Sequence, residues 1–150
     1  METAKDVSQR LLEITGTALL SGDFDRFMSC FHLPHCIETS DRKAVLETRD
    51  QMRAVFDRVV CDYRRKGVTD LVRVCDVAEF RGSDRIEATH TTHMMAGNYR
   101  VQDPFPAFCV IARVDGDWKL SASQYAVDNN TTVGRALHNT DIGVPSAPGA

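Results

Sequence analysis

Residues 68–97 read VTDLVRVCDVAEFRGSDRIEATHTTHMMAG, and apolar and polar side chains alternate along most of this stretch. An alternation with a period of two is typical of β-strands that bury one face. The triplet Gly82-Ser83-Asp84 interrupts the pattern, as short glycine-containing hairpin turns do. The stretch therefore predicts a long β-hairpin with strands over residues 68–81 and 85–97.

Helical patterns precede this hairpin, and two further strand patterns follow it. Apolar residues recur at helical spacing in three segments, of which the second ends at Pro34 because proline lacks the backbone N–H that a helix interior needs. The predicted helices cover residues 3–20, 24–33 and 49–66, the short strands 35–39 and 43–47, and the later strands 106–114 and 118–127. We therefore expect an α+β fold in which one curled antiparallel sheet wraps around three N-terminal helices.

The composition fits one globular domain. The 150 residues are 43% hydrophobic and 26% charged, and the formal net charge of −3 leaves no basic excess for a nucleic-acid surface. No apolar run approaches the roughly 20 residues of a membrane span, and the charged start METAKDVSQR is unlike a secretory signal peptide. Five scattered cysteines do not indicate a disulfide framework. We therefore expect a cytoplasmic protein that binds neither nucleic acid nor membrane, with a domain over residues 1–127 and a partly disordered polar tail over 128–150.

Three short motifs accompany this order of elements. They are Ser21-Gly22-Asp23-Phe24-Asp25 between the first two helices, the opening of the third helix over residues 49–60, and Asp115-Gly116-Asp117-Trp118-Lys119-Leu120 in the last hairpin. Together they resemble the nuclear transport factor 2-like (NTF2-like) superfamily, and its SnoaL-like and ketosteroid isomerase-like branch in particular. The resemblance covers roughly residues 5–127. It implies a cone-shaped domain with a cystatin-like fold, a pocket between the concave sheet and the helices, and a homodimer formed through the other face of the sheet.

An aspartate and a histidine on the predicted hairpin are the strongest catalytic candidates. If residues 82–84 form a three-residue turn, Asp76 faces His90, and the apolar residues on both sides pair as well. Directly opposed side chains in a sheet have Cβ atoms about 5 Å apart, which allows a carboxylate–imidazole hydrogen bond. The pair then works as an acid–base dyad, with Asp76 orienting His90, or it is a buried polar pair that fixes the register.

Apolar and aromatic side chains complete the predicted pocket. The segment Cys30-Phe31-His32-Leu33-Pro34-His35-Cys36 holds four potential zinc ligands, but a structural site usually joins two separated ligand pairs, so we expect no metal. The sequence has neither a glycine-rich phosphate loop nor a nucleophile elbow, so we also expect no cofactor. The expected lining residues, besides the Asp76–His90 pair, are Phe27, Phe56, Val74, Thr92, Met94 and Tyr125.

These features predict a domain that holds a small organic molecule in an apolar pocket. If the domain is catalytic, the expected chemistry is cofactor-independent acid–base catalysis, as in an isomerase, a cyclase or a dehydratase. The alternative is a non-catalytic dimeric module of the same fold that binds a ligand or associates with another protein. The fold does not choose between an enzyme and a binding module, and no residue names a substrate.

Overall fold

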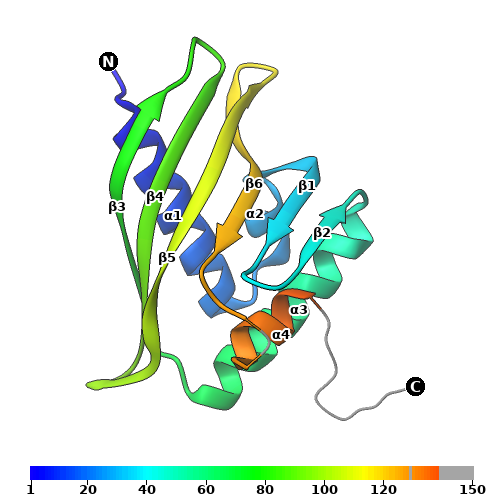
Figure 1. Ribbon diagram of the computed structural model, residues 1–150, viewed down its shortest axis with the longest axis vertical. Helices are drawn as coiled ribbons and strands as arrows, with labels where there is room; N and C mark the ends of the chain where they lie inside the picture. The colour runs from blue at the N-terminus through cyan, green and yellow to red at the C-terminus, as the bar shows by residue number, and fades with distance from the viewer. Residues whose placement is uncertain (129, 139–150) are drawn as a thin grey trace.

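A six-stranded sheet curls around the helices of the protein (Figure 1). The computed structural model describes residues 1–128 and 130–138. The helices are α1 (Ala4–Ser21), α2 (Phe24–Met28), α3 (Arg49–Lys66) and α4 (Thr132–His138). The strands are β1 (Phe31–Glu38), β2 (Lys43–Leu46), β3 (Asp70–Phe80), β4 (Arg85–Ala96), β5 (Tyr99–Val114) and β6 (Asp117–Tyr125). The strand order is β2-β1-β6-β5-β4-β3, and the predicted α+β fold with a curled sheet around N-terminal helices is confirmed.

Three details of this sheet differ from the sequence prediction. Strand β1 begins at Phe31, so Pro34 lies within a strand and does not end a helix. Pro34 is tolerated there because the β1–β6 pairing is irregular between Phe31 and Cys36. Strand β5 starts at Tyr99, where the sequence predicted a loose connection. Strands β1 and β6 are parallel, so the sheet is mixed and not entirely antiparallel.

The ends of the two long helices follow the residues that the sequence supplies for them. Helix α3 begins with a capping box in which Thr48 and Gln51 exchange hydrogen bonds, and it ends at Gly67, whose φ of 71° is left-handed. Glycine adopts that conformation without the steric penalty of a Cβ atom. Helix α1 ends in the same way at Gly22, with a φ of 77°. Within the described residues, no helix has both the length and the apolar character needed to cross a membrane.

The β3–β4 hairpin starts in the predicted register and then departs from it. Ala78 pairs with Ala88 near the turn, as expected. A β-bulge between Cys75 and Val77 then inserts one extra residue, so that His90 lies opposite Cys75. Because side chains alternate between the two faces of a sheet, this extra residue reverses the predicted face of every β3 residue that precedes it.

Helix α4 follows the sheet and packs against α3 (Figure 1). Its Val133, Ala136 and Leu137 side chains are buried, and Nε of Arg58 in α3 donates to the Ala136 carbonyl at 2.8 Å. The polar composition after residue 127 did not predict this helix, because its apolar positions span only two turns. The predicted polar tail therefore includes a helix over Thr132–His138, and the predicted disorder of residues 139–150 lies outside the described residues.

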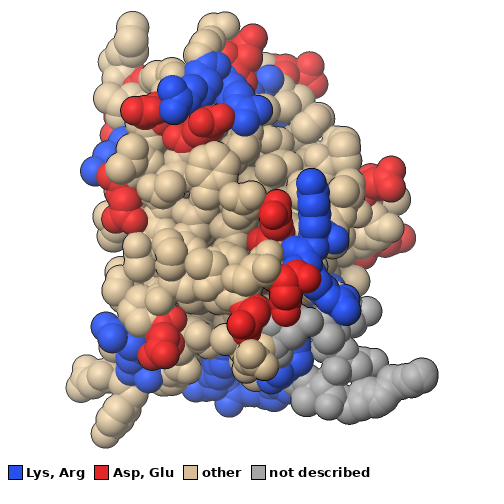
Figure 2. Space-filling view, in the orientation of Figure 1, with Lys and Arg blue, Asp and Glu red and all other residues tan. Residues whose placement is uncertain are grey.

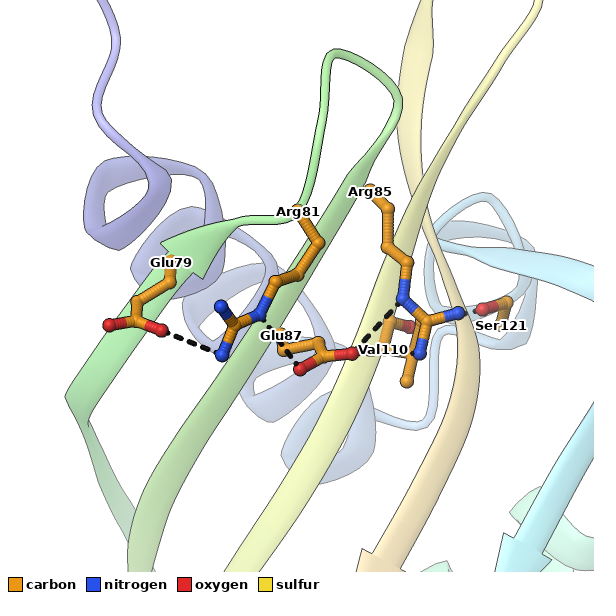
Figure 3. A network of polar contacts seen from close by, with 6 residues as sticks. All are labelled: Glu79, Arg81, Arg85, Glu87, Val110 and Ser121. Carbon is orange, nitrogen blue, oxygen red and sulfur yellow. Dashed lines mark hydrogen bonds and ion pairs between the residues drawn. The ribbon is translucent and has the colours of Figure 1, made fainter.

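Charged side chains gather at the tip of the β3–β4 hairpin (Figure 3). Arg81 contacts Glu79 at 2.9 Å and Glu87 at 3.1 Å, and Arg85 contacts Glu87 at 2.9 Å. Hydrogen bonds from Arg85 and then Arg81 lower the pKa of Glu87. These side chains are exposed to water, so their ion pairs add little stability. The network therefore lies at a hydrated end of the sheet, away from the core.

Candidate ligand-binding cavity

An interior cavity of about 80 Å³ lies between the inner face of the sheet and helices α1 and α3. Most of its wall is apolar, including Leu12 of α1, Phe56 and Val59 of α3, and Ile111 of β5. Pockets for drug-sized ligands have volumes of about 300–1,000 Å³. The cavity is therefore suited to a molecule of only a few non-hydrogen atoms.

Arg73 of β3 is one of the residues that line this cavity. Its Nη2 atom donates to the Leu12 carbonyl at 2.6 Å and to Thr15 Oγ1 at 2.7 Å, and both acceptors belong to α1. Its Nε atom is buried and has no hydrogen-bond partner among the described residues. No aspartate or glutamate oxygen in the described part of the chain lies within 4.0 Å of this guanidinium. Because arginine stays protonated even when buried, the cavity wall carries a positive charge without a neighbouring carboxylate.

The close approach of Arg73 to α1 depends on Gly16. A Cβ atom at this position would lie 3.1 Å from Arg73 Nη2, which is tighter than ordinary van der Waals contact. Glycine in a helix interior costs roughly 0.5–1 kcal/mol relative to alanine, and here it leaves room for the guanidinium. Helix α1 therefore positions Arg73 through two hydrogen-bond acceptors and one missing side chain.

His90 of β4 lies on the same inner face, opposite Cys75 and beside the Arg73–Thr92 pair. It is 4% exposed, and neither ring nitrogen has a hydrogen-bond partner among the described residues. Burial, reinforced by the positive charge of Arg73, lowers the pKa of His90 to about 4. The imidazole is therefore neutral at pH 7, with one nitrogen able to donate a hydrogen bond and the other able to accept one.

His35 of β1 is a second buried imidazole at the cavity, but both of its nitrogens have partners. Nδ1 lies 3.3 Å from the Leu120 carbonyl, which can only accept, so Nδ1 carries the proton. Nε2 then accepts a hydrogen bond from Ser123 Oγ, also at 3.3 Å. Burial lowers the pKa of His35 to about 4. These contacts connect β1 to β6, so His35 has a structural role. Of the two histidines at the cavity, only His90 has ring nitrogens without a partner among the described residues.

Besides His90, four ionisable side chains interact electrostatically with Arg73, and all four are neutral at pH 7 because burial raises pKa values that already lie above 7. Burial raises the pKa of the Tyr63 and Tyr125 phenols and of the Cys30 thiol, and it raises the pKa of Cys109 to about 12. None of these groups therefore supplies a negative charge to offset the guanidinium.

Comparison with known proteins identifies the fold. No family model matches the sequence, and no curated protein matches it. A structure of an NTF2-like protein of unknown function from Shewanella oneidensis MR-1 matches with a TM-score of 0.61 and 10% identity, over 81% of this chain and 98% of that chain. An NTF2-like protein with a cystatin-like fold from Novosphingobium aromaticivorans matches with a TM-score of 0.64 and 13% identity, over 90% and 88%. The protein has the NTF2-like fold.

Within this NTF2-like domain, the predicted pairing of Asp76 with His90 is wrong. The bulge places Asp76 on the outer face, where its carboxylate accepts a hydrogen bond from Thr91 Oγ1 at 3.0 Å. Val74 is also on the outer face and 56% exposed, so it does not line the cavity. Met94 is fully buried in the core but is not part of the cavity wall. The other predicted lining residues, Phe27, Phe56, Thr92 and Tyr125, do lie at the cavity.

Among the polar residues that line the cavity but were not assigned to it from the sequence, three are Arg73, Tyr63 and His35. Regular alternation along β3 predicted that Val74 is on the inner face of the sheet and Arg73 on the outer face. The bulge reverses both positions. Tyr63 belonged to the predicted buried stripe of the third helix. His35 stood in the cysteine- and histidine-rich segment that we considered for zinc, and no three potential metal ligands come together in the described part of the chain.

Proposed function

We propose that this NTF2-like domain binds a small organic molecule in its interior cavity. The observation that carries the proposal is His90, which is 4% exposed and has no hydrogen-bond partner for either ring nitrogen among the described residues. Buried polar side chains normally have partners, so an unpartnered imidazole at a cavity wall supports a binding role. Apolar walls around a few converging polar groups are also the usual composition of small-molecule sites.

Methyl NMR of the protein with three probes of similar size, butanol, butyramide and butyrate, tests this function. We expect at least one probe, at millimolar concentration, to shift the methyl signals of Leu12, Val59 and Ile111, which line the cavity. Val72 and Val74 are the matched controls, because both are exposed on the outer face. If none of the three probes shifts the lining methyl signals, the cavity is not a binding site.

His90 also favours a second candidate function, proton transfer on the bound molecule. A neutral imidazole can accept a proton at pH 7, and the nearby Arg73 charge would stabilise the negative charge that develops. The predicted orienting carboxylate is not available, because Asp76 lies on the outer face. Deuterium exchange next to the carbonyl of butanone, followed by NMR, should therefore be faster with the wild-type protein than with His90→Phe. Equal rates would exclude this reaction and leave binding alone.

The outer face of the sheet supports the further proposal of a homodimer. On edge strand β3, Val72, Val74 and Val77 are 45%, 56% and 56% exposed. The centre of the face in view shows few charged side chains, whereas charged groups gather at its top and bottom and over β1 and β2 (Figure 2). Exposed valines on this outer face favour association, because their burial in a dimer removes apolar area from water. A second copy of the chain is the occupant that the resemblance to NTF2-like proteins implies.

Substitution of one exposed valine tests the homodimer. Val74→Glu should weaken self-association by about tenfold or more, because a dimer would bury the new carboxylate without a partner. Val45→Glu is the matched control, since Val45 is 53% exposed on β2, at the opposite edge of the sheet. Sedimentation equilibrium measures the dissociation constants. A wild-type protein that stays monomeric, or equal effects of the two substitutions, would contradict a dimer through this face.

A further inference from the structure

The charge balance of the cavity restricts what it can bind. The guanidinium of Arg73 donates to two uncharged acceptors on α1, and its buried Nε has no partner among the described residues. Arg73 is partly buried, so its guanidinium keeps some contact with water, but the buried Nε atom has lost its hydration without gaining a partner among the described residues. His90 and the four other ionisable neighbours of Arg73 are neutral, and no described carboxylate lies within 4.0 Å. An anion bound at this guanidinium would accept the hydrogen bond that the buried Nε does not make within the described residues.

His90 adds a neutral hydrogen-bond donor beside this charge. The register places Thr92 opposite Arg73 and Cys75 opposite His90, so Arg73 and His90 are diagonal neighbours on the inner face. Diagonal neighbours have Cα atoms about 7–8 Å apart, and side chains as long as these two reach a common group between them. A charged donor and a neutral donor arranged in this way match the two oxygens of one carboxylate.

The remaining walls and the volume narrow the choice of anion. A phosphate or sulfate dianion would bring two charges to one guanidinium and leave oxygens facing apolar residues such as Phe56 and Ile111. The cavity of about 80 Å³ is far smaller than pockets for drug-sized ligands, so only a short hydrocarbon part fits beside the polar groups. We propose that the ligand is a small monocarboxylate, with its carboxylate between Arg73 and His90 and its short hydrocarbon part against the apolar wall. This inference rests on the proposed function and names the chemical class of its ligand.

Butyrate and butyramide have nearly the same shape and differ in charge, so comparing their affinities tests whether the cavity prefers a carboxylate. Titration calorimetry at pH 7 should show that the wild-type protein binds butyrate about tenfold more tightly than butyramide, or better. Arg73→Met keeps a long side chain and removes the charge. In that variant the two affinities should agree to within about twofold.

A milder variant is needed, because Arg73→Met also removes two hydrogen bonds to α1. Gly16→Ala places a Cβ atom 3.1 Å from Arg73 Nη2, so the guanidinium must move by a few tenths of an ångström. This variant should weaken butyrate binding severalfold and leave butyramide binding unchanged. Thr17→Ala, at an exposed position on the same helix, raises helix propensity, adds no atom near Arg73 and is the matched control.

The outcomes distinguish this inference from the proposed function. Butyramide or butanol binding as tightly as butyrate would overturn the carboxylate assignment and keep the proposed function. Inorganic phosphate binding more tightly than butyrate would also overturn it, in favour of a different anion. If none of these probes binds, both the inference and the proposed function fail.

Discussion

Between pH 7 and pH 4, the free energy of unfolding should fall by about 3 kcal/mol for each of the two buried histidines, His35 and His90. Each has a pKa of 6.5 as a model group and about 4 in the folded protein. Between these values the folded protein binds fewer protons than the unfolded chain, so protons favour unfolding as the pH falls. This stabilisation is complete above pH 6.5, and it is lost by about pH 4.

The two pKa shifts have the same main cause and differ in their secondary causes. Burial lowers the pKa of both histidines because the charged imidazolium loses its hydration. At His90 the Arg73 charge adds to this effect, and the Asp76 carboxylate opposes it. At His35 the hydrogen bond to the Leu120 carbonyl opposes it. A carboxylate bound beside His90 would raise the pKa of that histidine. Butyrate should therefore reduce the part of the fall in unfolding free energy at low pH that His90 causes.

Denaturant unfolding at pH 7, 5.5 and 4 measures this loss, and His90→Leu isolates one histidine. Between pH 7 and pH 4, the free energy of unfolding of this variant should fall by about 3 kcal/mol less than that of the wild-type protein. His93→Leu is the matched control, because His93 is on the same strand but on the outer face, and it should follow the wild type. Protonation of surface carboxylates affects all three proteins alike. If the free energy of unfolding falls by the same amount with pH in the wild type and in His90→Leu, His90 does not contribute to the acid destabilisation.

The sequence correctly predicted which side chains of β4 face the core, because apolar and polar residues alternate along this strand without interruption. The five residues predicted to face inward are all buried in the structure, which shows that period-two patterning identifies the core face of a regular strand. The hairpin turn was predictable for a similar reason, because the residues next to it pair without irregularity. These buried residues are Ile86, Ala88, His90, Thr92 and Met94.

The sequence did not predict which side chains of β3 face the core, because contacts with a distant helix determine this. Val72 and Val74 form an apolar row that indicates burial, yet both are exposed, and Arg73 and Cys75 face inward in their place. No glycine marks the bulge that causes this reversal. Instead, Gln9 of α1 donates to the Arg73 carbonyl at 3.1 Å and accepts from the Cys75 N–H at 2.8 Å, which fixes the backbone next to the bulge. The positive charge of the cavity depends on this contact between two distant segments.

Alanine at position 134 should release helix α4 from α3. A Cβ atom there would overlap the backbone carbonyl of Asp128. That carbonyl cannot move freely, because it accepts from the Thr131 N–H at 3.1 Å and from Thr131 Oγ1 at 2.8 Å. Alanine is the better helix former, so helix propensity alone predicts the opposite effect. We expect the overlap to dominate, at a cost of roughly 1–3 kcal/mol.

Release of α4 should also change which ligands the cavity accepts. Val133 and Leu137 of this helix line the cavity, and the hydrogen bond from Arg58 to the Ala136 carbonyl helps to hold them there. Without these two side chains the apolar wall is open on one side. Gly134→Ala should therefore bind hexanoate more tightly than the wild type does, and it should bind butyrate less tightly because the hydrocarbon part then contacts water.

Hydrogen exchange measures the release of α4 independently of any ligand. The amides of residues 135–138 should exchange about tenfold faster, or more, in Gly134→Ala than in the wild-type protein. Thr132→Ala, in the same helix, gains helix propensity without an overlap and should not exchange faster. Unchanged protection in Gly134→Ala would contradict the release. Faster exchange with unchanged selectivity between butyrate and hexanoate would show instead that α4 does not limit ligand size, so that the walls from α1, α3 and the sheet alone define the cavity.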